Sequence, residues 1–571
     1  MISQVDMHVH STYSGLSPDW YLRMLQSHES YTDIKQVFLR AIKRGKTFVT
    51  ITDHDQVEGS LRLKEIFPER VFSGAEYNVY FPEDHCKVHI LVYGQDEKQH
   101  RDLMSVREDI YQFRDYIRHH QMAYSVAHAL LAMDDKLNRT HLEKLILLFD
   151  VFEGINGSQL QVQNQAWVDT LRALTPESID ILFRRYHIDP ISSDPWVKGF
   201  TGGSDDHADL FIGRTYTEAR ADTVDGFLDA LRRKKTTASG SHSTIKDLSM
   251  SVIKMAYELG SRKSGHGFTV SLLRDTSAHV FEGYSISLKS RAQLGLLKMV
   301  NRFQPNPLRN LATRLLTSLA GEDFSDEGER AGKLYNCLMQ ISDEALVNII
   351  RSFNWLDCFK IDSSLEQIKS YLASLALCLP FYASLGFMHA SHRLIKDFRL
   401  DENGLTSTPR TQKRALWFVD DDSMADFAGG LVDLDVVFVS DRPIIGVLPQ
   451  KQVLLETLAQ IRIGQEKNRL IHIPSILKSL DLLAELQPDE IIISTSSPVG
   501  MIGFMLSRFL NLSCSGFFFD NSLSWVSQNE LSSRIFELLE QYNNWFFDQL
   551  TWLEITPNRE TAANQMALAE P

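Results

Sequence analysis

Residues 47–55 read TFVTITDHD, an apolar and β-branched run that ends in Asp53 and His54. Such a composition over a few positions predicts a buried strand. The preceding stretch, residues 31–45, reads YTDIKQVFLRAIKRG, and its apolar residues recur at spacings of three and four, which predicts an amphipathic helix. A strand therefore follows a helix here, and ionisable side chains stand where the strand ends.

The same alternation extends over the first 245 residues. Six further short runs are separated by helical patterns: VDMHVH (5–10), RVFSGAEY (70–77), KVHILVY (87–93), AYSVAHAL (123–130), FDVFEGIN (149–156) and FTGGSDDH (200–207). Alternating strands and helices favour a mainly parallel sheet or barrel. A helical pattern at 225–235 and a turn-rich stretch at 236–243 then close the unit, so we place its boundary near residue 245.

Histidine and carboxylate residues lie on these runs or at their ends. The candidate metal ligands are His8, His10, His54, Glu76, His89, His128, Asp205 and His207. Because the carboxyl ends of barrel strands meet at one rim, we expect these side chains to converge there. Nitrogen and oxygen ligands without thiolate suit Zn²⁺, Mn²⁺ or Fe²⁺, and the set exceeds what one tetrahedral ion needs. We therefore expect two or three divalent ions, with Asp53 supporting a neighbouring ligand rather than binding metal itself.

Read in order, these residues form the motifs H-x-H, TDH, G-x-E, a strand-borne His, AH and G-S-D-x-H. This succession, over about residues 3–245, resembles the PHP (polymerase and histidinol phosphatase) domain. The resemblance implies an α/β fold, a distorted seven-stranded β/α barrel with a metal-dependent phosphoesterase centre.

The resemblance also implies a division of the ligands among ions. His8, His10, Glu76 and Asp205 would hold one ion, Glu76 would bridge to a second ion held by His89 and His128, and His54 and His207 would serve a third. Relatives usually supply an Asp or His for the third ion shortly after the H-x-H pair, but this chain has Gly15 and Leu16 there. Asp19 is the nearest carboxylate. Occupancy of the third site is left open, and a two-metal centre is the alternative.

Such a centre would hydrolyse a phosphate ester by a metal-activated hydroxide, because divalent ions lower the pKa of bound water towards neutrality. Arg214 follows the last predicted ligands and is a candidate for binding the substrate phosphate, although pairing with Glu218 is an equally good interpretation. The formal charge is −14, from 59 Lys and Arg against 73 Asp and Glu. Because a negative surface repels the phosphate backbone, this charge argues against binding of long nucleic acid. We therefore expect a phosphomonoesterase for a small phosphorylated substrate rather than a nuclease.

The compartment is predicted from cysteine usage and from the N-terminus. The five cysteines form no CxxC pair, which favours a reducing compartment, and no signal-peptide pattern is visible, so a cytoplasmic location is expected. Residues 370–388 carry no charge and could just span a bilayer. Their serines, Pro380 and Gly386 favour a buried helix bent at Pro380 instead. The oligomeric state is left open.

Two further domains and a tail are predicted. Residues 246–410 show apolar stripes at helical spacing, which predicts a helical connector domain. Strand-like runs return at 411–555 and predict a Rossmann-like open α/β domain. Residues 556–571 are small and polar and are expected to form a flexible tail.

The C-terminal segment also resembles the first domain of two-domain glycosyltransferases. The stretch that carries the resemblance is QPDEIIISTSSPVG, residues 487–500. The opening loop has Ala428-Gly429-Gly430 in place of the usual Asn-Gly pair, and residues 517–521 read FFFDN. The chain also ends too early for the second domain of those enzymes. We therefore expect a degenerate domain that binds or scaffolds.

Two other functions remain open from the sequence. One is a non-catalytic, metal-stabilised scaffold that recruits partners, and the other is an accessory protein of a glycan pathway. The number of convergent ligands favours the hydrolase, because a scaffold would not require so many.

Overall fold

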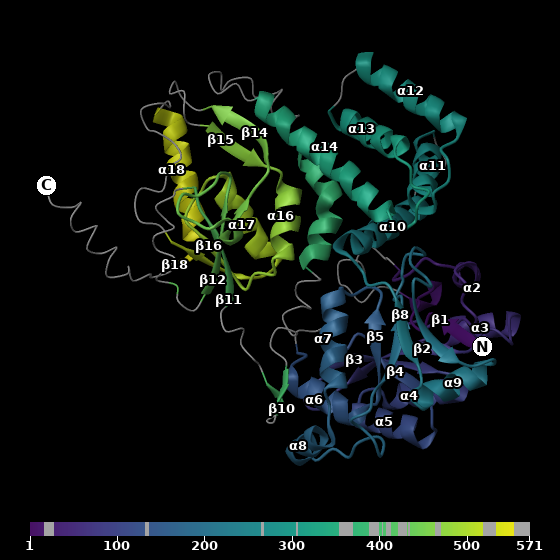
Figure 1. The fold of residues 1–571 in the computed structure, drawn as a ribbon. Coiled ribbons are helices and arrows are strands. Elements are labelled where there is room, and N and C mark those ends of the chain that lie inside the picture. The colour runs from purple at the N-terminus through teal and green to yellow at the C-terminus, as the bar shows by residue number, and fades with distance from the viewer. Residues whose placement is uncertain are drawn as a thin grey trace. The chain divides into compact units, whose positions relative to one another are not determined.

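The structure, a computed structural model, describes residues 1–15, 28–131, 136–263, 268–303, 307–352, 369, 371–386, 399–401, 404–406, 413–420, 431, 434–462, 470–517 and 533–552. The chain forms two compact units (Figure 1), the first comprising Met1–Ser277 and Phe387–Thr408 and the second Ala278–Gly386 and Pro409–Pro571. The three-domain division predicted above stays a prediction.

The first unit contains two main sheets. A five-stranded sheet has the order β2-β3-β4-β5-β6 and comprises β2 (Gly74–Tyr80), β3 (Lys87–Tyr93), β4 (Ala123–Val126), β5 (Val151–Asn156) and β6 (Gly199–Gly203). A three-stranded antiparallel sheet has the order β1-β7-β8 and comprises β1 (Ile2–Val5), β7 (Thr215–Arg220) and β8 (Thr237–Gly240). A small two-stranded sheet pairs β9 (Arg399–Asp401) with β10 (Gly404–Thr406).

The predicted α/β class is confirmed, whereas the seven-stranded barrel is not. In the five-stranded sheet β2, β3 and β4 pair antiparallel, and only β4, β5 and β6 pair parallel. The short connection 81–86 between β2 and β3 explains the difference, because a parallel pair needs a much longer crossover. The run at 47–55 forms no full strand and makes only isolated parallel bridges, Val49 to Val71 and His54 to Glu76.

Helices cover these sheets and bury their apolar faces. They are α2 (Ile34–Lys43), α3 (Glu58–Ile66), α4 (Glu97–Val106), α5 (Ile110–His119), α6 (Arg139–Leu148), α7 (Gln161–Arg172), α8 (Pro176–Tyr186), α9 (Val224–Arg232) and α10 (Ile245–Lys263), with a short 3₁₀ turn at Thr12–Ser14. The predicted helix within 31–45 begins after Asp33, whose carboxylate accepts from Lys35 N and caps α2. Trp167 of α7 packs edge-on against Phe152 of β5, with ring centroids 5.7 Å apart.

The second unit begins with helices. After α11 (Phe268–Glu282), the helices α12 (Leu288–Phe303), α13 (Pro307–Gly321) and α14 (Arg330–Ser352) lie side by side (Figure 1), and a further helix covers 371–386. That last helix includes most of the uncharged run at 370–388 and continues through Pro380. Among the helices that the structure describes, none combines the length and the apolar composition needed to cross a bilayer.

A six-stranded, wholly parallel sheet follows. Its order is β13-β12-β11-β16-β17-β18, from β11 (Lys413–Phe418), β12 (Leu434–Ser440), β13 (Gln452–Leu454), β16 (Glu490–Ile493), β17 (Ser513–Gly516) and β18 (Thr551–Trp552). The helices α16 (Ile476–Glu485), α17 (Pro498–Phe509) and α18 (Ser533–Asp548) accompany it, with a hairpin of β14 (Thr457–Arg462) and β15 (Leu470–Pro474). The loop at 421–430, residues 518–532 and the predicted tail lie outside the described residues.

Candidate metal centre

The predicted ligands come together in the first unit: some lie just beyond the ends of β1, β4 and β6, whereas Glu76 and His89 lie within β2 and β3 rather than at their ends as expected. Asp6 joins two of these ends, because its Oδ1 accepts from His8 N at 3.3 Å and from Ser204 N at 2.8 Å. Asp205 N in turn donates to His8 O at 2.7 Å. The chain just beyond β1 is thereby fixed beside the chain just beyond β6, although the two are about two hundred positions apart in the sequence. All eight predicted ligands are buried or half-buried.

Glu76, in β2, lies at the centre of the cluster and is fully buried. Its Oε2 is 3.0 Å from His8 Nε2, 3.3 Å from His10 Nε2 and 3.2 Å from His54 Nδ1. Its Oε1 is 2.7 Å from His89 Nδ1 and 3.2 Å from His128 Nε2. The two oxygens of one carboxylate therefore face two separate groups of imidazoles.

Asp205 approaches the same histidines from the end of β6. Its Oδ1 is 3.4 Å from His8 Nε2 and 3.3 Å from His10 Nε2. Its Oδ2 accepts from Asn156 Nδ2 at 3.2 Å and from Ser158 Oγ at 2.8 Å, which fixes the orientation of the carboxylate. Its φ of 50° lies in the left-handed region, a conformation that costs a non-glycine residue about 1–3 kcal/mol and is concentrated at functional sites.

A third group forms around His54 and His207. His10, His54 and His207 each offer a nitrogen, and these nitrogens all lie within 4.8 Å of one another. The ring of His207 stacks on that of His10, with centroids 4.0 Å apart. Glu29 completes this group, because its Oε1 is 3.2 Å from His54 Nε2.

Glu29 was missed by the sequence reasoning, which looked for a carboxylate at Gly15 and Leu16. Gly15 has a φ of 80°, in the left-handed region that favours glycine. Glu29 N donates to Gly15 O at 3.0 Å, which holds Glu29 beside Gly15 and its carboxylate within reach of His54. Asp19 and Leu16 lie outside the described residues.

Glu153, in β5, was also missed. Its Oε1 lies 2.9 Å from His8 Nδ1, and its Oε2 accepts from His128 N at 2.7 Å. The available signal was a glutamate within the otherwise mostly apolar FDVFEGIN run. Glu153 therefore orients the imidazole of His8, as outer partners of metal-binding histidines do, and fixes the backbone of His128 through its N–H.

Asp53 occupies a supporting position. Its Oδ1 accepts from Ser11 N at 2.6 Å and from Ser14 Oγ at 2.9 Å, and Ser14 Oγ is 3.0 Å from His10 Nδ1. Asp53 thus acts on His10 through Ser14. Whether each of these residues binds or supports a metal stays a prediction.

The charges of the centre depend on burial and on the close carboxylates. Burial by itself lowers the pKa of His10, but its hydrogen bonds to Asp205 and Glu76 outweigh that effect and raise the pKa to about 10. Burial likewise opposes ionisation of Glu76, yet the surrounding histidines, His8 first, hold its pKa well below the usual value. Burial lowers the pKa of His89 and of His207 to about 4, so these two rings are neutral at pH 7 and free to donate a lone pair.

The donor set fits divalent cations. Four groups of three residues bring their donor atoms within 4.8 Å of one another: His8 with His10 and Glu76, His8 with His128 and Asp205, His54 with Glu76 and His89, and His10 with His54 and His207. Nδ1 of His54 and Nδ1 of His89 are buried and lie 3.2 Å and 2.7 Å from the two oxygens of Glu76. Imidazole and carboxylate together are ligands for divalent transition metals.

A cavity of about 220 Å³ opens on these ligands. One wall is apolar and comes from Leu131, Phe211 and three residues of α10, Leu248, Val252 and Met255. Arg214 does not line the cavity. Its guanidinium donates to Asp247 Oδ1 at 3.3 Å and lies 4.7 Å from the centroid of Phe211. The alternative pairing of Arg214 with Glu218 is wrong: Glu218 accepts from Gln4 and Ser239.

We expect Glu153→Gln to weaken divalent-metal binding by about 10- to 100-fold, the usual effect of removing an outer partner of a ligating histidine. The amide keeps the shape of the side chain but carries no charge to hold the His8 Nδ1–H. Metal titration by calorimetry checks this, with Glu218→Gln on β7 as the matched control. Equal affinity in wild type and Glu153→Gln would contradict the positioning role.

Comparisons with known proteins give little beyond this geometry. No family model matches the chain. A segment of 66 residues is 35% identical to an uncharacterized protein of Methanocaldococcus jannaschii, covering 12% of this chain and 37% of that relative's length. Among solved structures, a candidate metal-dependent phosphoesterase from Bifidobacterium adolescentis is 13% identical, covers 40% of this chain and 96% of its own, and superposes with a TM-score of 0.23. A likeness at this level assigns neither a fold nor an activity to the chain.

Proposed function

We propose that the first unit is a phosphomonoesterase that uses two or three divalent metal ions. The observation that carries the proposal is the position of Glu76, whose Oε2 faces His8, His10 and His54 while its Oε1 faces His89 and His128. A carboxylate shared in this way between two sets of imidazoles is what a bridge between two cations requires. Multinuclear centres of this composition serve displacement at phosphorus.

The proposed division of the ligands is the one that the resemblance to the PHP domain implies, with Glu29 added. His8, His10, Glu76 and Asp205 would hold one ion, and Glu76, His89 and His128 a second. His54, His207 and Glu29 would hold a third, with Glu29 in the place left open by Gly15 and Leu16. Divalent ions bound there supply positive charge that lowers the pKa of water towards neutrality and offsets negative charge on phosphate oxygens.

The cavity favours a small substrate. Its volume of about 220 Å³ is below the range of about 300–1,000 Å³ typical of pockets for drug-sized ligands. No lysine or arginine lines it in the described part of the chain, so the phosphate would be held by the cations rather than by a guanidinium. The apolar residues of α10 favour a compact, weakly polar leaving group, and a long nucleic acid would not fit.

The experiment is a hydrolysis screen with the purified full chain. After dialysis against a chelator we expect no hydrolysis of small phosphomonoesters such as p-nitrophenyl phosphate, and recovery of activity on addition of Mn²⁺, Zn²⁺ or Fe²⁺. Short oligonucleotides under the same conditions should stay intact. Full activity without metal, or no ester cleaved with any of these ions, would reject the proposal and leave the metal-stabilised scaffold in its place.

Metal binding is expected to strengthen as pH rises. In the metal-free chain the pKa of His10 is raised to about 10 by Asp205 and Glu76, against the effect of burial, and the pKa of His8 is also raised well above the usual value. Both imidazoles are therefore in the cationic, doubly protonated form at pH 7, and each must lose one proton to bind a metal ion. The measured affinity should rise by up to about tenfold per pH unit for each proton released between pH 6 and 9. Titrations in buffers of different ionisation enthalpy count these protons, and a pH-independent affinity would contradict the prediction.

For the C-terminal sheet we propose a Rossmann-like domain. Counted along the chain, its strand order is 3-2-1-4-5-6, with the reversal between β11 and β16, which is the order of dinucleotide-binding folds. Its resemblance to a glycosyltransferase domain, and a role in binding or scaffolding, remain proposals.

A further inference from the structure

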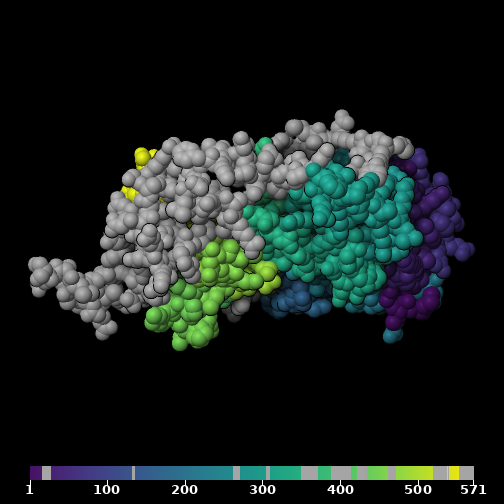
Figure 2. Space-filling model, turned by 90° about the horizontal axis from the view of Figure 1, so that it is seen from above, coloured from purple at the N-terminus to yellow at the C-terminus, as the bar shows by residue number. Residues whose placement is uncertain are grey.

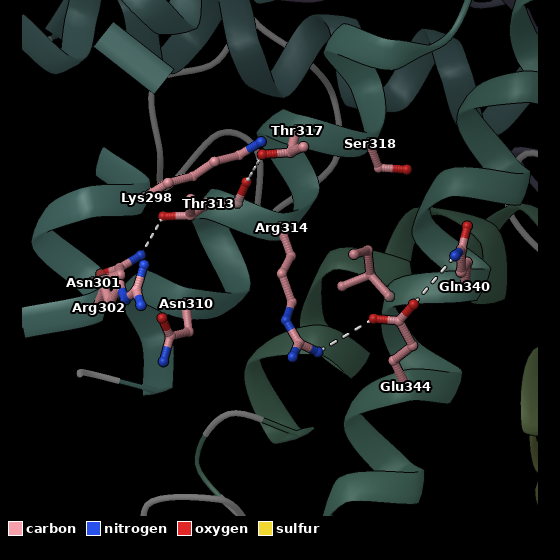
Figure 3. A pocket seen from close by; sticks show the side chains of 11 residues that line it. Lys298, Asn301, Arg302, Asn310, Thr313, Arg314, Thr317, Ser318, Gln340 and Glu344 are labelled. Carbon is pink, nitrogen blue, oxygen red and sulfur yellow. Dashed lines mark hydrogen bonds and ion pairs between the residues drawn. The ribbon is translucent and has the colours of Figure 1, made fainter. Parts of the chain in front are cut away.

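The helices α12, α13 and α14 of the second unit surround a cavity of about 520 Å³ that belongs to no site described above. Figure 3 shows the side chains that line it, and Figure 2 shows the helical region, in teal, as a broad surface of the molecule. Three of the lining residues are cationic, Lys298, Arg302 and Arg314, and one is anionic, Glu344. The described lining therefore carries a net charge of about +2 at pH 7.

The positive charges are not balanced within the cavity. Arg314 Nη1 donates to Glu344 Oε2 at 3.2 Å, from α13 to α14 (Figure 3). Lys298 and Arg302 stand four positions apart on α12, and within the described part of the chain the structure gives neither a side-chain hydrogen bond nor an ion pair. Like charges at this spacing destabilise a helix, and a bound anion would remove that cost.

A buried amide adds a second, independent sign of a ligand. Asn301 is 8% exposed and lines the same cavity. Its Nδ2 donates to Thr313 Oγ1 at 2.6 Å, which fixes the orientation of the amide. Its Oδ1 is buried and has no hydrogen-bond partner among the described residues. A buried acceptor left without a donor costs free energy, and a hydroxyl group on a ligand would supply the missing donor.

We propose that this cavity binds a small phosphorylated compound that carries hydroxyl groups, such as a sugar phosphate. Ammonium and guanidinium groups form charge-assisted hydrogen bonds with phosphate oxygens, and Lys298 and Arg302 would meet the phosphate. Asn301 Oδ1 would accept from a hydroxyl of the same ligand. The site lies entirely in the second unit and is independent of the proposed phosphoesterase activity.

The test is calorimetric titration of the full chain with ribose 5-phosphate, ribose and inorganic phosphate. The protein is first dialysed against a chelator, so that the metal centre holds no ions that could bind phosphate. We expect ribose 5-phosphate to bind more tightly than inorganic phosphate, and ribose not to bind. Binding of inorganic phosphate with equal affinity would reject the role of Asn301 and the hydroxylated ligand, and binding of none of the three would reject the site.

Two sets of variants locate the binding. Lys298→Glu with Arg302→Glu should weaken ribose 5-phosphate by at least about 100-fold, since each lost charge-assisted contact is worth about tenfold or more. Lys289→Glu with Arg291→Glu makes the same charge change on α12 outside the cavity and should leave the affinity unchanged; an equal loss would show mere long-range attraction and overturn the proposal. If the reversed charges prevent folding, Lys298→Gln with Arg302→Gln replaces them.

Asn301→Leu tests the hydroxyl contact. It should weaken the binding of ribose 5-phosphate by about tenfold and leave the binding of inorganic phosphate unaffected.

Discussion

Glu76→Gln is expected to lower the rate of phosphomonoester hydrolysis by at least about 1,000-fold and to remove most of the bound metal. Loss of an outer partner of a metal ligand already costs about 10- to 100-fold, and Glu76 is the side chain that both imidazole groups share. The amide has nearly the same volume, so packing is kept. The glutamine lacks the negative charge that neutralises divalent ions. Its NH₂ group would also face histidine nitrogens whose lone pairs are needed to bind the metal.

Metal content by elemental analysis and kcat/KM on p-nitrophenyl phosphate are the two measurements. Glu218→Gln, the same change on β7 away from the centre, should keep both at the wild-type level. A Glu76→Gln protein that retains its metal and its activity after dialysis would show that this carboxylate bridges nothing, and the proposed function would fall with it.

Gly203→Ala is expected to destabilise the first unit by about 3 kcal/mol or more, at the upper end of the effect of overpacking a core. An added Cβ at Gly203 would lie 2.3 Å from the Cβ and 2.6 Å from the N of His8. These atoms belong to His8 itself, so they cannot move without shifting His8 away from Glu76. Metal affinity should therefore fall together with stability.

Chemical denaturation of the metal-free chain measures the loss of stability without contribution from bound ions. Gly260→Ala in α10 is the control, because a Cβ there meets no atom within 4 Å and alanine favours a helix. A Gly203→Ala protein as stable as wild type, with unchanged metal affinity, would mean that β6 can withdraw from His8 at little cost.

The sequence allowed the cluster to be predicted because its residues stand on short strand-like runs or just after them. His8 and His10 alternate with Val9, so both point to the same side of the chain, and Asp205 and His207 repeat that spacing across Asp206. Glu29 could not be found in this way, since no strand-like run of apolar residues precedes it in the sequence. In the structure its N–H donates to Gly15 O beside the site. Glu153 looked like an ordinary strand residue until His8 and His128 were seen beside it.

The arrangement of the strands was harder to predict than their positions. Composition and periodicity located β2 and β3, but they do not fix the direction of pairing, and the short loop at 81–86 makes this pair antiparallel. The parallel C-terminal sheet was easier to predict, because β11 and β16 are continuous apolar runs, buried on both faces, as parallel strands usually are.

The span between His8 and Asp205 has a consequence during protein synthesis. A ribosome releases the amino end first, so His8 and His10 leave it long before the β5 and β6 segments that hold Glu153 and Asp205 exist. In the growing polypeptide the two imidazoles still lack Asp205, one of the two carboxylates that contact them both, and an incomplete, unfolded site binds metal weakly. We therefore expect divalent metal ions to bind only after the first unit has been translated and folded. The complete set of ligands then selects among the cations that are available in the cell.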